Sequence, residues 1–89
     1  MYKIKDIQRK RANFYGVEIK PSTRKGKKID VFKNGKKVAS IGAIGFKDYA
    51  THMEQSGKAY ADKRRTAYLV RHYKDVKKGN GMWAWRILW

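Results

Sequence analysis

The dipeptide Asn34-Gly35 constrains the fold of this chain more than any other short segment. The two β-prone runs that it separates are residues 28–33 and 36–41. Asparagine and glycine tolerate the two positive φ angles of a type I′ turn, whose twist matches that of paired antiparallel strands. The dipeptide therefore predicts a two-residue β-hairpin in which Val31 lies opposite Val38. The same register places Phe32 opposite Lys37. The side chains expected on the core face are those of Ile29, Val31 and Val38.

Two segments before the hairpin are candidate strands. Residues 14–20 are rich in β-prone side chains and are followed by Pro21, which ends a strand readily. Residues 2–7 are a second candidate. Together with the hairpin they predict an antiparallel meander of three or four strands in the N-terminal half.

The spacing of apolar residues changes after the glycine-bounded segment 42–45. A short helix is expected from about residue 47, capped by Asp48 and ended by Gly57. A long helix is expected from about residue 58 to residue 78, because apolar residues there recur at steps of three and four. The stripe expected to be buried comprises Ala59, Asp62, Thr66, Leu69, Val70, Tyr73 and Val76. Gly79 is the expected stop.

The last eight residues hold all three tryptophans of the chain. Both a strand and a helix would gather their apolar side chains on one face, so periodicity leaves the choice open. The segment is too apolar to remain in solvent, and we expect it to complete the core. Exposed tryptophans that stack on bases or anchor a protein are the alternative. The predicted fold class is α+β, a small antiparallel sheet covered by one long helix and the aromatic C-terminal segment.

Composition bounds the class of protein. The chain has 89 residues, and 23 Lys and Arg against 7 Asp and Glu give a formal net charge of +16. A chain of this length forms one domain, here residues 1–89, and the absence of cysteine excludes disulfides and thiolate metal sites. Neither a membrane-spanning segment nor a secretory signal is recognisable, so secretion is not expected. The charge favours a polyanionic partner.

Three segments carry a family resemblance. They are Gly45-Phe46-Lys47-Asp48-Tyr49 with His52, Arg64-Arg65-Thr66-Ala67-Tyr68-Leu69-Val70-Arg71-His72, and the tryptophan-rich end that finishes Leu88-Trp89. The pattern resembles a small domain of unknown function that recurs in large double-stranded DNA viruses of algae and amoebae and in some tailed phages. The resemblance implies a viral setting and a short C-terminal helix, and it implies no chemistry.

The basic face of the long helix is the first candidate binding surface. Arg64, Arg65 and Arg71 are predicted to contact phosphates, because guanidinium groups form bidentate bonds with them. Tyr68, at helical spacing from Arg64, is predicted to donate a hydrogen bond or to stack on a base. In the alternative, these stems only cover the sheet and Asp75 pairs with Arg71.

The basic loop before the hairpin is the second candidate. Lys25, Lys27 and Lys28 are predicted to contact phosphates, and the alternative is a solvated turn. The two histidines, His52 and His72, would need carboxylate ligands from Asp48 or Asp75 to hold a metal, and a structural zinc site has four ligands that usually include cysteine. A metal-dependent nuclease is disfavoured because the chain has no paired-carboxylate motif. No metal, cofactor or catalytic residue is therefore expected.

These features predict a non-enzymatic viral protein that binds nucleic acid through its phosphates, with DNA favoured over RNA and low sequence specificity. Genome packaging or nucleoprotein organisation would use such binding. The alternative is a minor structural protein of the virion that docks on acidic faces of capsid subunits. Either would place the protein in the virion or in the host cytoplasm or nucleoplasm. Oligomeric state is left open, and no membrane partner is expected.

Overall fold

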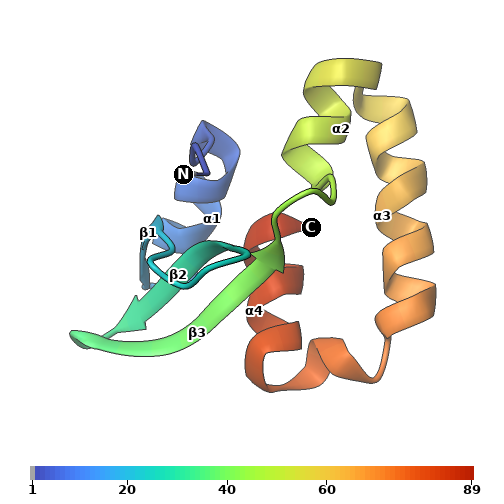
Figure 1. The fold of residues 1–89 in the computed structure, drawn as a ribbon. Coiled ribbons are helices and arrows are strands. Elements are labelled where there is room, and N and C mark those ends of the chain that lie inside the picture. Colours follow the sequence, from blue (N-terminus) through green and yellow to red (C-terminus); the bar gives the residue numbers. More distant parts are fainter. Residues whose placement is uncertain (1) are drawn as a thin grey trace.

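The fold consists of a three-stranded antiparallel sheet and four α-helices, which confirms the α+β class. The computed structural model describes residues 2–89. Its elements are α1 (Asp6–Phe14), β1 (Glu18–Pro21), β2 (Lys27–Lys33), β3 (Lys36–Ala43), α2 (Tyr49–Ser56), α3 (Lys58–His72), a 3-10 turn η1 (Asp75–Lys77) and α4 (Gly79–Leu88). Figure 1 shows α2 and α3 as a helical pair beside the sheet, with α4 between α3 and the strands. Within the described residues, no helix is long and apolar enough to cross a membrane.

The hairpin forms at the expected turn but with a different register. Asn34 and Gly35 have φ angles of 53° and 78°, as a type I′ turn requires. Phe32 pairs with Lys37 as expected, but a bulge then inserts one extra residue into β3. Val31 consequently pairs with Ala39, and Val38 is 43% exposed. The prediction of Val38 as core was wrong, because one extra residue moves the following side chains to the other face.

The N-terminal segment is helical, so the strand predicted over residues 2–7 was wrong, whereas the strand predicted over residues 14–20 is confirmed in its last part. Residues 2–7 form no strand, and β1 occupies only the end of the expected 14–20 segment. The Gln8 side chain accepts a hydrogen bond from the Lys5 backbone N–H at 2.9 Å and so caps the first turn of α1. Ala12 of α1 and Ile4 before it are buried against the sheet and α4. One face of α1, which contains Gln8 and Ala12, is therefore buried.

The long helix ends earlier than expected and buries a different face. It stops at His72, and the expected stripe lies largely in solvent, with Val70 74% and Tyr73 55% exposed. Ala61 is the one fully buried residue of α3, and Tyr68 turns inward against the rings of α4. Flat aromatic rings fill the space between the two helices, and this contact selects the face of α3.

The C-terminal segment is a helix that completes the core, as expected. Trp83, Ile87, Leu88 and Trp89 are buried together with the inner face of the sheet. Gly79, the predicted stop of the long helix, is instead the first residue of α4. The remaining inner-face residues of this core are Ile19, Ile29, Val31, Ala39 and Ile41.

Candidate nucleic-acid interface

A cleft of about 570 Å³ lies between one face of α3 and the segment that joins β3 to α2, and we call it the α3 cleft. The segment from Gly45 to His52 forms one side, and the segment from Arg64 to His72 forms the other. Ala84 and Leu88 of α4, with Trp89 directly after it, contribute apolar surface to the cleft. The three segments that carry the family resemblance therefore line one cavity, although up to about forty residues separate them in the chain.

A buried polar network at Asp48 holds the side of this cleft formed by residues 45–52 in place. The Asp48 carboxylate accepts hydrogen bonds from the Tyr2 hydroxyl at 2.6 Å and the Thr51 backbone N–H at 2.9 Å. It also pairs with the Lys28 ammonium at 3.0 Å, and Lys28 donates a second bond to the Phe46 carbonyl oxygen. Asp48 is thus the cap of α2, as predicted, and it also joins β2 to the N-terminal segment.

The same network neutralises the carboxylate of the cleft. Burial alone raises the pKa of Asp48, but the hydrogen bonds from Tyr2 and Thr51 and the Lys28 ammonium outweigh burial and lower it. Asp48 is therefore ionised at neutral pH, with its charge balanced by Lys28. Lys28 is only 5% exposed, so the structure places this predicted phosphate contact inside an internal ion pair.

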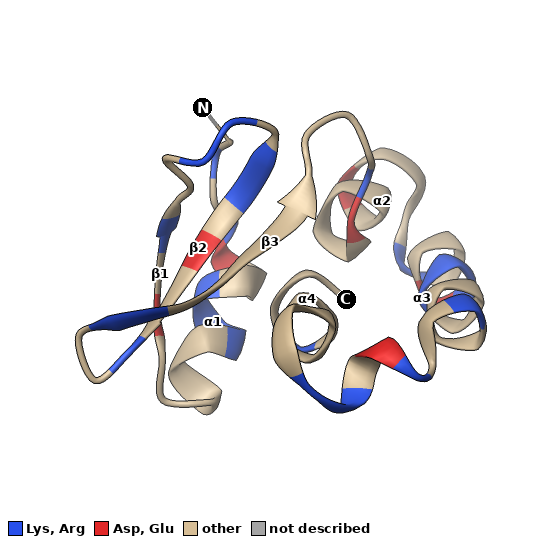
Figure 2. Cartoon of the chain, turned by 60° about the horizontal axis from the view of Figure 1, so that its bottom comes forward, with Lys and Arg blue, Asp and Glu red and all other residues tan. Residues whose placement is uncertain are grey.

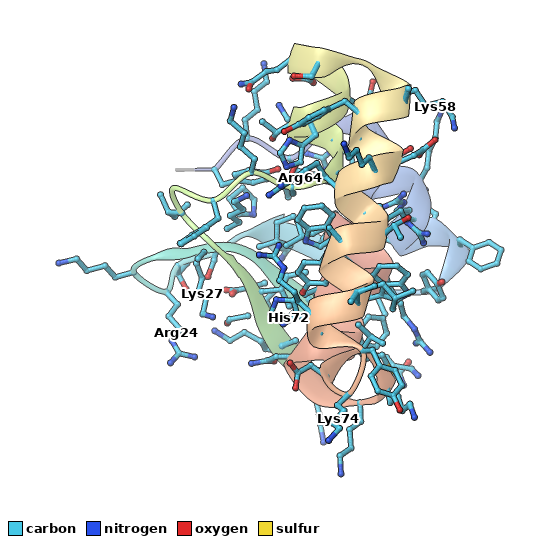
Figure 3. The ribbon with its side chains drawn as sticks, turned by 90° about the vertical axis from the view of Figure 1, so that its right-hand side faces the viewer. Arg24, Lys27, Lys58, Arg64, His72 and Lys74 are labelled. Atoms are coloured by element: carbon cyan, nitrogen blue, oxygen red, sulfur yellow. The ribbon has the colours of Figure 1, made fainter. Side chains whose placement is uncertain are left out.

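Three cations at the cleft have no such partner. Within residues 2–89, Lys47, Arg64 and Arg71 form no ion pair with an Asp or Glu side chain. The Nε atom of Arg64 is buried and has no hydrogen-bond partner. Figure 3 shows Arg64 and His72 on the side of α3 toward which Arg24 and Lys27 of the basic loop also lie. The cleft consequently carries an excess of positive charge that nothing in the described chain balances.

The two histidines contact other protein side chains, His52 in the core and His72 at the surface. His52 is buried between the rings of Tyr60 and Trp89, and burial, with Arg64 and Lys47 nearby, lowers its pKa. Its imidazole is therefore neutral at physiological pH. His72 lies 3.3 Å from Asp75, so Asp75 pairs with this histidine and not with Arg71. The residues described contain no cluster of metal-ligating side chains.

Tyr68 forms part of the cleft wall. Its ring stacks on Trp89 at 4.5 Å and on His72 at 4.4 Å between centroids. Burial raises the pKa of its hydroxyl. Because the Tyr68 ring already stacks on protein rings, it has no free face on which a base could stack. Its stacking makes the cleft wall rigid, and its hydroxyl remains a hydrogen-bonding group.

The other predicted residues separate into two groups. Lys25 and Lys27 lie beside the cleft, since the Ile44 backbone N–H bonds to the Gly26 carbonyl at 2.9 Å and joins the two loops. Arg65 points away from it: its Nε atom donates to the Trp89 carbonyl oxygen at 2.7 Å, and its guanidinium lies over the Trp85 ring. Sequence reasoning missed Lys47, although this residue stands inside the motif from Gly45 to His52.

The comparison with known families gives a match without a function. A family described as a family of unknown function (DUF5754) matches residues 17–72, which include the whole sheet, α2 and α3. Searches of curated proteins and of solved structures gave no significant match. Any function must therefore be argued from the α3 cleft and its charges.

Proposed function

Since the chain belongs to DUF5754, a family of unknown function, we propose its function from the cleft: it binds nucleic acid through the phosphate backbone, without catalysis. Lys47, Arg64 and Arg71 contact phosphates at the cleft, and Lys25 and Lys27 extend the contact along the adjacent loop. Lys28 and Arg65 hold the structure of the site instead. Contacts of this kind carry little sequence information, and we propose DNA as the preferred polymer.

The single observation that supports this proposal most is the unpartnered charge of Arg64. A buried guanidinium N–H with no acceptor is destabilising, because it has lost its water without gaining a hydrogen bond. A phosphate oxygen supplies both an acceptor and a negative charge. The cations Lys47 and Arg71 beside it would then share the same polyanion.

The distribution of charge favours a polymer over a small anion. Figure 2 shows basic segments on α1, the β1–β2 loop, β2 and α3, whereas acidic ones are few. Two of the seven acidic residues, Asp30 and Asp48, are buried in internal hydrogen bonds. A polyanion can follow such a surface and gains binding free energy at each phosphate by releasing condensed counterions.

The family resemblance supports a viral setting for this activity. We propose that the protein acts on the genome during packaging or in a nucleoprotein particle, in the virion or in the host cytoplasm or nucleoplasm. Fractionation of purified particles tests this part: the protein is expected to stay with the genome fraction after the shell is removed.

Affinity for a fluorescein-labelled 12-base-pair DNA duplex tests the proposed function. Anisotropy titrations between about 50 and 200 mM salt are expected to give a linear fall of log affinity with log salt, at about −0.9 for each phosphate neutralised. Four to five contacts predict a slope of roughly −4. A flat dependence, or no binding at 100 mM salt, would contradict backbone binding.

A second function is favoured by one specific observation, the unpartnered outer face of α3. Val70 is exposed there, Tyr73 is exposed just after the end of the helix, and Lys63 and Lys74 are exposed in the same stretch of chain. A basic rim around apolar groups suits an acidic protein surface, so we also propose a minor structural role in which this face docks on capsid subunits. Recovery of the protein with the empty shell would support this role over genome binding.

A further inference from the structure

A second basic depression lies on the other side of the molecule, and we call it the α1–α4 groove. It has a volume of about 320 Å³ and is lined by α1, Tyr15, Arg65 and the end of α4. Its cationic lining residues are Lys10, Arg11, Arg65 and Arg86. No Asp or Glu side chain lines it.

The guanidinium groups of this groove are held in place by aromatic rings. Arg65 lies over Trp85 with 4.2 Å to the ring centroid, Arg86 lies over Tyr15 at 4.8 Å, and Arg11 lies over the Tyr49 ring at 5.0 Å. A guanidinium stacked by its face keeps the N–H groups at its edge available for phosphate, except where, as at the Nε of Arg65, one already donates to a protein carbonyl oxygen. The rings thus orient the cations without neutralising them.

Two observations indicate that the groove suits an anion. One terminal nitrogen of Arg11 is buried and has no hydrogen-bond partner among the described residues. Burial and the nearby charge of Arg65 lower the pKa of Arg11, so the groove brings like charges together in a partly buried place. An anion bound between these side chains would supply the missing acceptor and relieve the repulsion.

The groove and the α3 cleft face opposite ways. Trp89 lines both of them, so the stacked rings of Trp89 and Tyr68 form the wall between the two depressions. In Figure 3, α1 lies on the side of α3 opposite to Arg24 and Lys27. The chain measures 36 × 27 × 26 Å, whereas duplex DNA is stiff over about 150 base pairs. One short duplex therefore cannot occupy both depressions.

We propose that the α1–α4 groove is a second phosphate-binding site and that a single chain bridges two DNA duplexes. This inference rests on the proposed function for the α3 cleft and adds a second contact with a separate role. Bridging of this kind draws neighbouring duplex segments together, as genome condensation requires.

A two-duplex capture experiment tests the bridging. One 12-base-pair duplex is immobilised on beads, the protein is added, and unbound protein is washed away. A second, fluorescent duplex is then added, and both the protein and the fluorescence retained on the beads are measured. Wild-type protein is expected to retain the second duplex.

Site variants assign the capture to the two depressions. R11Q/R86Q removes two groove cations, and R64Q/R71Q removes two cleft cations. Each variant is expected to stay on the beads through its remaining site and to lose capture of the second duplex by about tenfold. The matched control K33Q/K36Q removes two exposed cations from the hairpin tip and is expected to capture as wild type does.

Each outcome separates the explanations. Capture by R11Q/R86Q at the wild-type level overturns the groove as a site, and bridging by protein oligomers would give that same result. Wild-type protein that stays on the beads without capturing a second duplex contradicts bridging but leaves the cleft proposal intact. Failure of the wild type to bind the first duplex contradicts the proposed function itself. If R11Q/R86Q fails to fold, the exposed Lys10→Glu substitution is used, with the same expected loss.

Discussion

At the scale of single residues, the two buried aspartates show how so basic a chain can fold. Asp30 is 2% exposed on the middle strand and accepts hydrogen bonds from the hydroxyls of Ser22 at 2.6 Å and Ser40 at 2.7 Å. Asp48, at the start of α2, likewise accepts hydrogen bonds from several donors while buried. Each carboxylate is surrounded by donors that satisfy it, so each organises polar groups from three segments of the chain.

Asp30 should make the protein sensitive to acid. Burial alone raises the pKa of Asp30, but the hydrogen bonds from Ser22, Ser40 and the Thr23 backbone, with the Lys37 charge, lower it. As pH falls below about 4, the unfolded chain takes up this proton before the folded one does, so stability falls. Urea unfolding between pH 2 and 7 is expected to show this loss. Asp30→Asn should lower the free energy of unfolding at pH 7 by about 2 kcal/mol and reduce its further loss below pH 4. An unchanged loss below pH 4 in this variant would contradict the role of Asp30 in acid sensitivity.

A substitution of Lys28 tests whether this residue stabilises the fold or contacts phosphate. Lys28→Met keeps the length of the side chain but leaves Asp48 without its counter-charge, so we expect a loss of about 3 kcal/mol in urea unfolding. The salt slope of duplex binding, measured where the variant remains folded, should not change. A stable Lys28→Met variant whose slope falls by about 0.9 would restore Lys28 to the phosphate contacts.

At the scale of elements, the junction between η1 and α4 depends on the absence of a side chain. A Cβ atom at Gly81 would lie 2.1 Å from the Asp75 carbonyl oxygen, which is backbone and cannot move aside alone. Gly81→Ala is therefore expected to destabilise the protein by at least about 2 kcal/mol in thermal or urea unfolding. The neighbouring Asn80→Ala, at an exposed position, should change stability by less than about 0.5 kcal/mol. Equal effects of the two substitutions would contradict this tight contact.

Local signals predicted some elements and failed for others. The hairpin turn, the Asp48 cap and the stop at Gly57 depend on residues adjacent in the chain, and they are present as expected. The strand predicted over residues 2–7 rested on β propensity alone, but α1 begins there and is stabilised by Gln8, which contacts Tyr2 and Asp48. Such contacts cannot be read from local propensity.

Which face of α3 turns toward the core could also not be predicted from local sequence. Both faces of this helix carry apolar and basic residues, and the face that turns inward is chosen by Tyr68 stacking on Trp89, twenty-one residues further along the chain. The motif residues Arg64 and Arg71 were identified from the sequence, but their meeting with Lys47 depends on how α2 and α3 pack together. The sequence thus allowed the basic residues to be identified, but it did not show that they meet in one cleft.

At the scale of the whole molecule, the cations behind the formal charge of +16 differ in whether they have a partner within the protein. Lys5, Lys28, Lys37 and Lys58 form ion pairs within the protein. Other cations lie over aromatic rings, and each of the two depressions contains one guanidinium group, that of Arg64 or of Arg11, with a buried nitrogen that has no acceptor among the described residues. The central claim is that binding is concentrated at these places, the α3 cleft first, and does not follow from total charge alone.

The most direct test of that claim compares salt slopes for variants of equal net charge. R64Q/R71Q and K33Q/K36Q each remove two positive charges, the first pair from the α3 cleft and the second from the hairpin tip. The slope of log affinity against log salt for the 12-base-pair duplex should become shallower by about 1.8 for the cleft variant. It should change by less than about 0.5 for the hairpin variant. Equal changes in both variants would show that the duplex is held by diffuse charge and would contradict the α3 cleft as the binding site.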